Sequence, residues 1–457
     1  MLFQSLAAAA ALAGSAHASP VLLRRQGGGS GLPANATIPD FTNATNVTYS
    51  PTAPTTNGTS LNQPVFDSVP LGVDNSTWAG YTNATASTNG TLPVNGTSNS
   101  TEPYPGASII IGNPVKNGTN ETLAWVGQPA GGLIDNKPEY IAKSNFDFQS
   151  LNLALNQELI ELDLFHNGLA KFSVEEFEAA GLTADDRNLL AHMADQEVGH
   201  ALAISNMLGP DRSAKQCVYT YPYTNVKEFI LFSQLLTRWG EAGVYGFLGQ
   251  LDSRPASQIL LQSITTEARQ QLIFRQFQGL PAMPEWFETG IPQTYAWTLL
   301  SKYIKSCPPN NPRIEFTRFP DLNITNQAYA LGGQPGINSN YTLTQPGGQI
   351  AFSWDEPGKT VGYDNSYVTS TVAGQPKYLA WIDQLNVTYS PIMNISNSSG
   401  VWTAVADVPT GVVFPPEPQV VNSAFVSLVD DNIYLTPYNL SLINNHTVAG
   451  PALFQAS

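Results

Sequence analysis

The middle of the chain, over 139–306, has apolar residues every three or four positions, which is the period of an amphipathic α-helix. This pattern predicts four long helices, over about 147–170, 183–208, 226–251 and 255–279. Ser173 and Glu176 have capping-box spacing and Gly181 follows, so a short helix is expected between the first two. A further amphipathic segment covers about 292–306. Four helices of this length are the elements of a four-helix bundle.

After Asn310 the pattern changes to short apolar runs separated by Gly, Pro, Asn and Asp, which is typical of β-strands. The clearest runs are 349–354, 367–372, 378–381, 401–406 and 424–429. Their spacing predicts a small β-sandwich. The expected fold is therefore α+β and multidomain, with a four-helix bundle over 137–310 and a β-rich domain over 311–457.

The chain before the helices has two different segments. Residues 1–18 read as a secretory signal, because a short apolar run is followed by the small-x-small pattern Ala16-His17-Ala18. The pair Arg24-Arg25 is either a processing site or a flexible flank. Residues 19–136 are rich in Asn, Ser, Thr and Pro and cannot bury enough apolar area to fold, so we expect an extended, glycosylated segment.

Charge and apolar content exclude two classes of binding partner. The formal charge is -15, with 12% of residues charged. We expect no nucleic-acid partner, because there is no Lys/Arg cluster to neutralise phosphates. We also expect no membrane partner, because no segment after the signal has the roughly 18 consecutive apolar residues of a spanning helix. Secretion makes cell-wall polysaccharide or extracellular matrix the expected partner class, in an extracellular or cell-wall location. Oligomeric state stays open.

N-glycosylation sequons lie on both sides of the predicted bundle, and none lies within it. Glycans need exposed loops, so this distribution is the one expected of sites that are used. They are Asn35, Asn43, Asn46, Asn57, Asn75, Asn83, Asn89, Asn95, Asn99, Asn117, Asn120, Asn323, Asn340, Asn386, Asn394, Asn397, Asn439 and Asn445. The two cysteines of the chain, Cys217 and Cys307, are expected to form a disulfide, because an oxidising compartment makes a bridge the default.

The predicted bundle has acidic residues on its apolar stripes. A dinuclear carboxylate site in such a bundle takes one Glu from each of two helices and Glu-x-x-His from each of the other two. The second helix contains Glu197-x-x-His200 on its core stripe. The other candidate ligands are Glu158 on the first helix, with Glu161 as second choice, Glu241 on the third and Glu267 on the fourth.

Gln270 stands where the recipe needs the second His, and an amide is a poor ligand for a first-row divalent ion. Two interpretations therefore stay open. Either the site holds a di-iron or di-manganese centre, or the carboxylates are paired inside a metal-free bundle. The expected partners in the second case are Gln157, Gln196, Arg238, Gln250 and Arg269.

Three segments of the helical region resemble the ferritin-like domain of fungal stress-response and late-sexual-development proteins: 148–169, 194–203 and 264–277. Plant desiccation-related proteins look like more distant relatives. Residues 378–389 and 436–456 are similar to the C-terminal half of the fungal group, so the resemblance covers about 137–457. It implies a role in stress, desiccation or fruiting-body development, with no established reaction. The ferritin-type ligands that it implies are Glu158, Glu197, His200, Glu241 and Glu267.

Three functional hypotheses follow. The first is a non-enzymatic, secreted stress or developmental glycoprotein whose metal site is incomplete. The second is a di-metal (Fe/Mn) carboxylate oxidoreductase or a metal-sequestering protein. The third is a binder of an apolar small molecule in the bundle interior. Metal content separates the first two, and an apolar cavity would favour the third.

Overall fold

The computed structural model describes residues 140–209, 211–327, 329, 347–409 and 422–456. The predicted signal segment, Arg24-Arg25, the low-complexity segment and its eleven sequons lie outside these residues, as does Asn340. None of the helices in the described part is long and apolar enough to cross a membrane.

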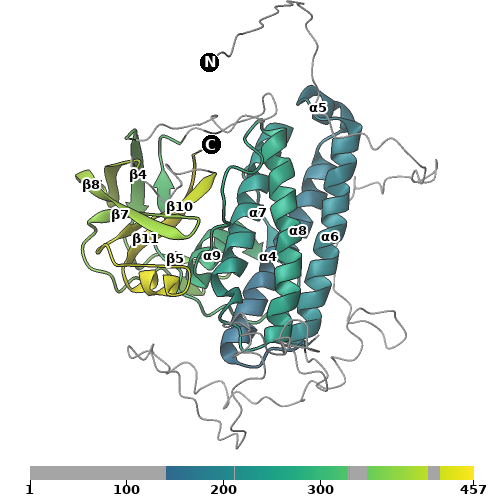
Figure 1. Cartoon of the computed structure of the whole chain (residues 1–457), viewed down its shortest axis with the longest axis horizontal. Coiled ribbons are helices and arrows are strands. Elements are labelled where there is room, and N and C mark those ends of the chain that lie inside the picture. The colour runs from purple at the N-terminus through teal and green to yellow at the C-terminus, as the bar shows by residue number, and fades with distance from the viewer. Residues whose placement is uncertain (1–139, 210, 328, 330–346, 410–421, 457) are drawn as a thin grey trace, which may run out of the picture.

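All four predicted long helices are present, and they lie side by side (Figure 1). The helices are α4 Asn145–Lys171, α5 Val174–Ala179, α6 Ala184–Leu208, α7 Val226–Leu248, α8 Arg254–Phe277 and α9 Gln293–Leu300. Side chains at Ser144, Ser173, Thr183, Asn225 and Ser253 cap the first five helices. The segment predicted as one amphipathic piece over 292–306 is α9, a 3-10 turn over Ser301–Tyr303 and the short strand β2, Ile304–Ser306.

Contacts at the helix ends fix the helix directions. Ala142 N–H donates to the Met207 carbonyl, so the start of α4 lies at the end of α6. The start of α4 also lies at the turn between α7 and α8, where the Asp147 carboxylate accepts from Ser253 N–H at 3.0 Å. Since α6 therefore runs parallel to α7, the connection over 209–225 spans the length of the bundle. One long crossover of this kind is the connectivity of ferritin-like folds.

The predicted disulfide ties this crossover to the segment after α9. Cys217 is bonded to Cys307, ninety positions later in the chain. Beside the bridge, the strand β1, Val218–Tyr219, pairs antiparallel with β2. The covalent loop encloses α7, α8 and α9, so the bridge restricts the unfolded chain over much of the helical region.

The C-terminal part contains one seven-stranded antiparallel sheet with the order β11-β10-β7-β8-β9-β4-β3. Its strands are β3 Leu322–Ile324, β4 Gln349–Asp355, β7 Tyr378–Asp383, β8 Asn386–Ser398, β9 Val401–Asp407, β10 Ser423–Val429 and β11 Thr447–Gln455, and a separate pair consists of β5 Thr360–Val361 and β6 Tyr367–Val368. The two edges of the sheet meet, because Gln327, just after β3, exchanges two hydrogen bonds with the Gln455 backbone in β11. The expected two-sheet sandwich is thus corrected to a single sheet that curls around its own core.

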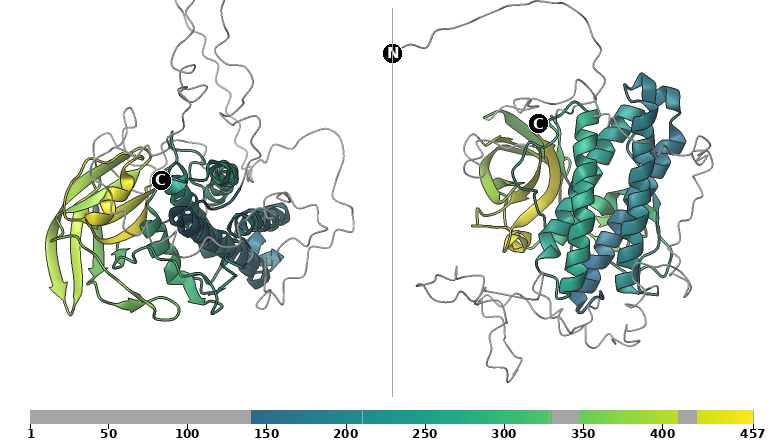
Figure 2. Two further views of the ribbon diagram at one scale, coloured as in Figure 1. Left: turned by 90° about the horizontal axis from the view of Figure 1, so that it is seen from below. Right: turned by 45° about the vertical axis from the view of Figure 1, so that its right-hand side comes forward.

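Strand alternation gives this sheet two apolar faces. In β7, Leu379 and Trp381 point into the core enclosed by the curl, whereas Ala380 and Ile382 belong to the core that the sheet shares with the helices. Helix α9 lies between the sheet and the bundle (Figure 1), and both views of Figure 2 show the sheet on one side of the helices. The boundary near residue 310 therefore separates helices from strands but does not separate two hydrophobic cores.

Six predicted glycosylation sites fall in the described part. Asn323, Asn394, Asn397 and Asn445 are exposed, and Asn386 and Asn439 are partly exposed. Their glycosylation stays a prediction, and none of these positions is enclosed by the fold.

Candidate metal centre

Three of the four long helices bring acidic side chains to one point inside the bundle. Glu158 comes from α4, Glu197 and His200 from α6, and Glu267 from α8. One ligand atom of each lies within 4.8 Å of the others. Glu197 and His200 share a helix face because they are three positions apart.

The imidazole lies at the centre of this group. His200 Nδ1 is 3.2 Å from Glu158 Oε2, 3.2 Å from Glu197 Oε2 and 3.7 Å from Glu267 Oε1. Only the contact with Glu197 has hydrogen-bond geometry. One ring N–H thus faces three carboxylates and can satisfy one of them.

Gln270 takes a different role from the histidine of the two-metal recipe. Its Nε2 donates to Glu197 Oε1 at 2.6 Å and to Gln196 Oε1 at 3.2 Å. The amide is therefore turned so that its nitrogen holds a carboxylate in place. A second imidazole-bearing metal position is missing at this corner of the site.

Glu161, the second choice on α4, is also buried in the site. It is fully buried, and neither of its carboxylate oxygens has a hydrogen-bond partner. Burial, followed by the charges of Glu197 and Glu158, raises its pKa well above the usual range. The sequence favours Glu158, with Glu161 as second choice, and in the structure both side chains are buried.

Unpartnered oxygens test whether these residues fit a cation. Glu158 Oε2, both oxygens of Glu161, Glu267 Oε1 and Gln270 Oε1 are buried without a hydrogen-bond donor. Buried acceptors are normally satisfied, and each orphaned one costs about 1–3 kcal/mol. Carboxylates and imidazole are ligands for first-row divalent ions, so the residues fit a metal ion.

Without such an ion, burial favours the protonated forms of Glu158, Glu161 and Glu267. Burial raises the pKa of Glu158 to about 8 against the opposing effect of His200, and burial likewise raises the pKa of Glu267 well above its usual range. Burial alone would lower the pKa of His200, but the Glu158 and Glu197 carboxylates outweigh it and raise that pKa to about 12. The metal-free centre is thus most stable when Glu158 and Glu267 are protonated.

We therefore expect the chelator-treated protein to lose stability as the pH rises from about 5 to about 8. The folded state keeps a proton on Glu158 up to about pH 8, whereas an unfolded glutamate loses it near 4.5. The folded chain binds more protons in this window, so its unfolding free energy falls with pH. Thermal melting in EDTA should show a decrease of about 5 °C or more. Glu158→Gln should flatten the curve, and an unchanged slope would contradict the assignment.

Glu241, the ligand expected from α7, is not in this cluster. Its Oε1 lies 3.0 Å from Arg238 Nη1, one turn earlier on the same helix. The guanidinium also contacts Glu285 at 3.1 Å and Glu288, both in the segment after α8. Arg238 is fully buried and draws Glu241 toward the sheet side of α7, so the prediction of four converging glutamates is corrected to three, with Glu161 beside them.

This Arg238 cluster was not found from the sequence. Arg238 had been named as a partner for a bundle carboxylate, but Glu285 and Glu288 lie some fifty positions away in an irregular segment. Arg238 Nε also donates to the Ser423 carbonyl at 3.3 Å, in β10. The cluster joins the bundle to the sheet.

Comparison with known proteins agrees with this architecture. The model of the ferritin-like domain family matches residues 146–280. Protein rds1 of Schizosaccharomyces pombe is 46% identical over 349 residues, which cover 72% of this chain and 86% of the relative. The similarity thus extends well beyond the helices, and the chain belongs to the family of fungal ferritin-like proteins that includes protein rds1.

Proposed function

We propose that the ferritin-like domain binds a single divalent metal ion through Glu158, Glu197, His200 and Glu267. The observation that carries this proposal is the set of buried, unpartnered carboxylate oxygens around one point. Three or four buried carboxylates beside one imidazole need a positive charge, because an unpaired buried charge is costly. When bound, a divalent ion supplies that charge and acts as a Lewis acid.

The same geometry argues for one ion rather than two. A two-metal centre of the ferritin type needs ligands from all four helices. Here Glu241 is paired with Arg238, and Gln270 donates its Nε2 to Glu197. The domain would therefore bind one metal ion but would lack the second metal position that a two-metal oxidation reaction requires. We therefore favour a metal-binding protein over an oxidoreductase.

The setting that we propose is a secreted stress- or development-associated glycoprotein of a fungus. The support is the signal-like start, the sequons on both sides of the bundle and the accessible positions of those in the sheet region. The disulfide between Cys217 and Cys307 fits the same oxidising compartment. Metal retention outside the cell, beside a glycan-coated surface, is the role that these features support together.

The hypothesis of an apolar ligand in the bundle gains no support from the described residues. The cavity between α4, α7 and α9, lined by Gln157 and Trp239, has a volume of about 10 Å³. That is about the space of one water molecule. A hydrophobic molecule would not fit there without displacing packed side chains.

Metal analysis of protein purified from culture medium without chelators tests the proposal. We expect close to one equivalent of Fe, Mn or Zn per chain, and Glu197→Ala should remove it. Glu241→Gln should keep the metal, because Glu241 lies outside the cluster.

The outcomes separate three situations. A metal content near zero for correctly folded wild-type protein would eliminate metal binding. Two equivalents, lost in Glu241→Gln, would restore the di-metal interpretation. Circular dichroism of each variant shows whether a lost metal reflects a lost ligand or a lost fold.

A further inference from the structure

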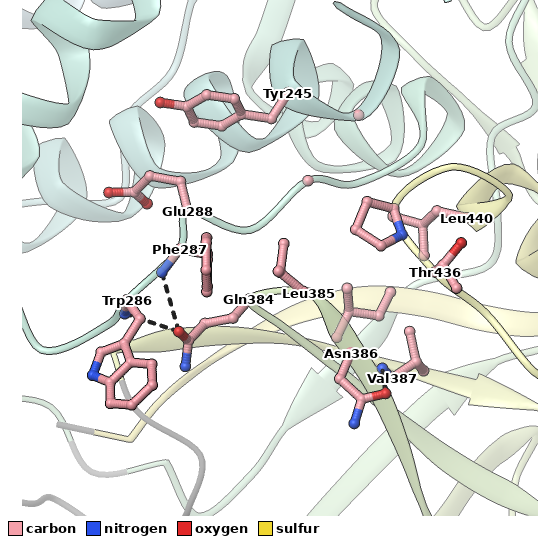
Figure 3. A pocket seen from close by; sticks show the side chains of 14 residues that line it. Tyr245, Trp286, Phe287, Glu288, Gln384, Leu385, Asn386, Val387, Thr436 and Leu440 are labelled. Atoms are coloured by element: carbon pink, nitrogen blue, oxygen red, sulfur yellow. Dashed lines mark hydrogen bonds between the residues drawn. The ribbon is translucent and has the colours of Figure 1, made fainter. Parts of the chain in front are cut away.

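A pocket of about 440 Å³ opens between the helical bundle and the sheet, and none of its lining residues belongs to the metal centre (Figure 3). The end of α7 forms one side, the segment over 286–290 another, and the turn between β7 and β8 the floor. Residues 436–440 complete the rim. The volume lies within the range of small-molecule sites.

Aromatic side chains stand open at this pocket. Trp286 is 58% exposed and Phe287 is 42% exposed, although large aromatic groups normally bury most of their surface. Tyr438, next to the lining residue Pro437, is 80% exposed. The exposed parts of these rings offer apolar surface to a ligand.

Gln384 supplies a polar group with a defined direction. The residue is 3% exposed, and its Oε1 accepts hydrogen bonds from the backbone N–H groups of Trp286 and Phe287 at 2.9 and 3.1 Å. The backbone N–H of Gln384 donates to Thr289 Oγ1 at 2.7 Å, so the backbone of this residue is held as well as its side-chain oxygen. The remaining donor, Nε2, has no partner. In Figure 3 this nitrogen lies beside the Trp286 ring.

The charges of the lining exclude some ligands. No Lys or Arg is among the lining residues, and Glu288 is the single charged group. An anionic ligand would meet a carboxylate and no counter-charge. A neutral ligand with an apolar face and hydroxyl groups matches the aromatic rings, the amides of Gln384 and Asn386, and Thr436.

We propose that this pocket binds a neutral sugar residue, which stacks its apolar face on Trp286 and accepts a hydrogen bond from Gln384 Nε2. Two sources have this chemistry. One is a separate neutral oligosaccharide of the surroundings. The other is the chain's own glycan at Asn386, since that sequon asparagine lines the pocket at the start of β8. The site does not depend on the metal centre.

Calorimetric titration of the full chain with hexasaccharides of β-1,3-glucan, chitin and mannan tests the proposal. Wild-type protein and Asn386→Gln, both from a glycosylating host, distinguish the sources. Binding by both indicates a separate ligand. Binding by Asn386→Gln alone indicates that the chain's own glycan occupies the pocket. Failure of both to bind any of the three overturns the proposal.

Two variants test the contacts. Trp286→Ala should weaken binding at least tenfold, whereas Tyr329→Ala, an exposed aromatic that does not line the pocket, should leave it unchanged. Gln384→Glu keeps an acceptor for the two backbone N–H groups but removes the donor, and it should weaken binding in the same direction. Equal binding by Trp286→Ala and wild type would place the sugar elsewhere and overturn the assignment.

Discussion

Replacing Arg238 by methionine is expected to destabilise the folded protein by about 3–5 kcal/mol. The guanidinium is fully buried and faces the carboxylates of Glu241, Glu285 and Glu288. Methionine fills much of the same volume but leaves these acids without their cation. Removing one partner from a buried ion network is costly because the fully buried Glu241 is left without its counter-charge.

Urea unfolding of the variant measures this effect. Arg269→Met is the matched control. Arg269 is exposed on α8, and the only hydrogen bond that its side chain makes within the described residues is with Thr266. It should change stability by less than about 0.5 kcal/mol. The double variant Arg238→Met/Glu241→Gln should recover part of the loss. A loss below about 1 kcal/mol in Arg238→Met would show that the cluster does not hold the two halves together.

Gly246→Ala is expected to lower the free energy of unfolding by about 3 kcal/mol, although alanine has a higher helix propensity than glycine. Gly246 lies in α7, where alanine would by itself favour the helix. A Cβ at this position, however, would lie 1.7 Å from the Ile291 carbonyl oxygen. Ile291 N–H donates to the Ala242 carbonyl of the same helix, so the segment cannot move away without losing that bond.

Thermal melting should show a decrease of roughly 6–12 °C for this variant. Gly199→Ala is the control, because Gly199 also lies within a long helix and a Cβ there meets nothing within 4 Å. That variant should be unchanged or more stable by up to about 1 kcal/mol. Equal effects of the two substitutions would mean that the close approach at Gly246 does not constrain the fold.

The helices were predictable because each has local signals at both ends. Ser173 and Glu176 form the predicted capping box, and the N-caps at Thr183 and Asn225 match the predicted starts. The sheet was less predictable because pairing partners are distant in sequence. The thirteen-residue strand β8 and the buried strand β11 were missed, since glycosylation sequons and a Gly-Pro pair made them resemble loops.

Local periodicity also explains which site residues were found. The inward positions of Glu158, Glu197 and Glu267 follow from their place on an apolar stripe. Glu241 lies on such a stripe too, and it is fully buried as expected. Periodicity fixes the face of a helix but not which neighbour that face meets. For α7 the neighbours include Ser423 and Glu288, which only the folded chain brings near.

The apolar core that runs without interruption from Phe165 on α4 through Tyr295 on α9 to Phe425 on β10 has an evolutionary consequence. Recombination that replaced the helices with those of another ferritin-like protein would remove the apolar surface against which the sheet packs. It would also separate Arg238 from the strand carbonyl that it contacts. The helices and the strands are therefore expected to be inherited as one unit. A substitution on one side of the interface between them should be accompanied by a compensating substitution on the other side.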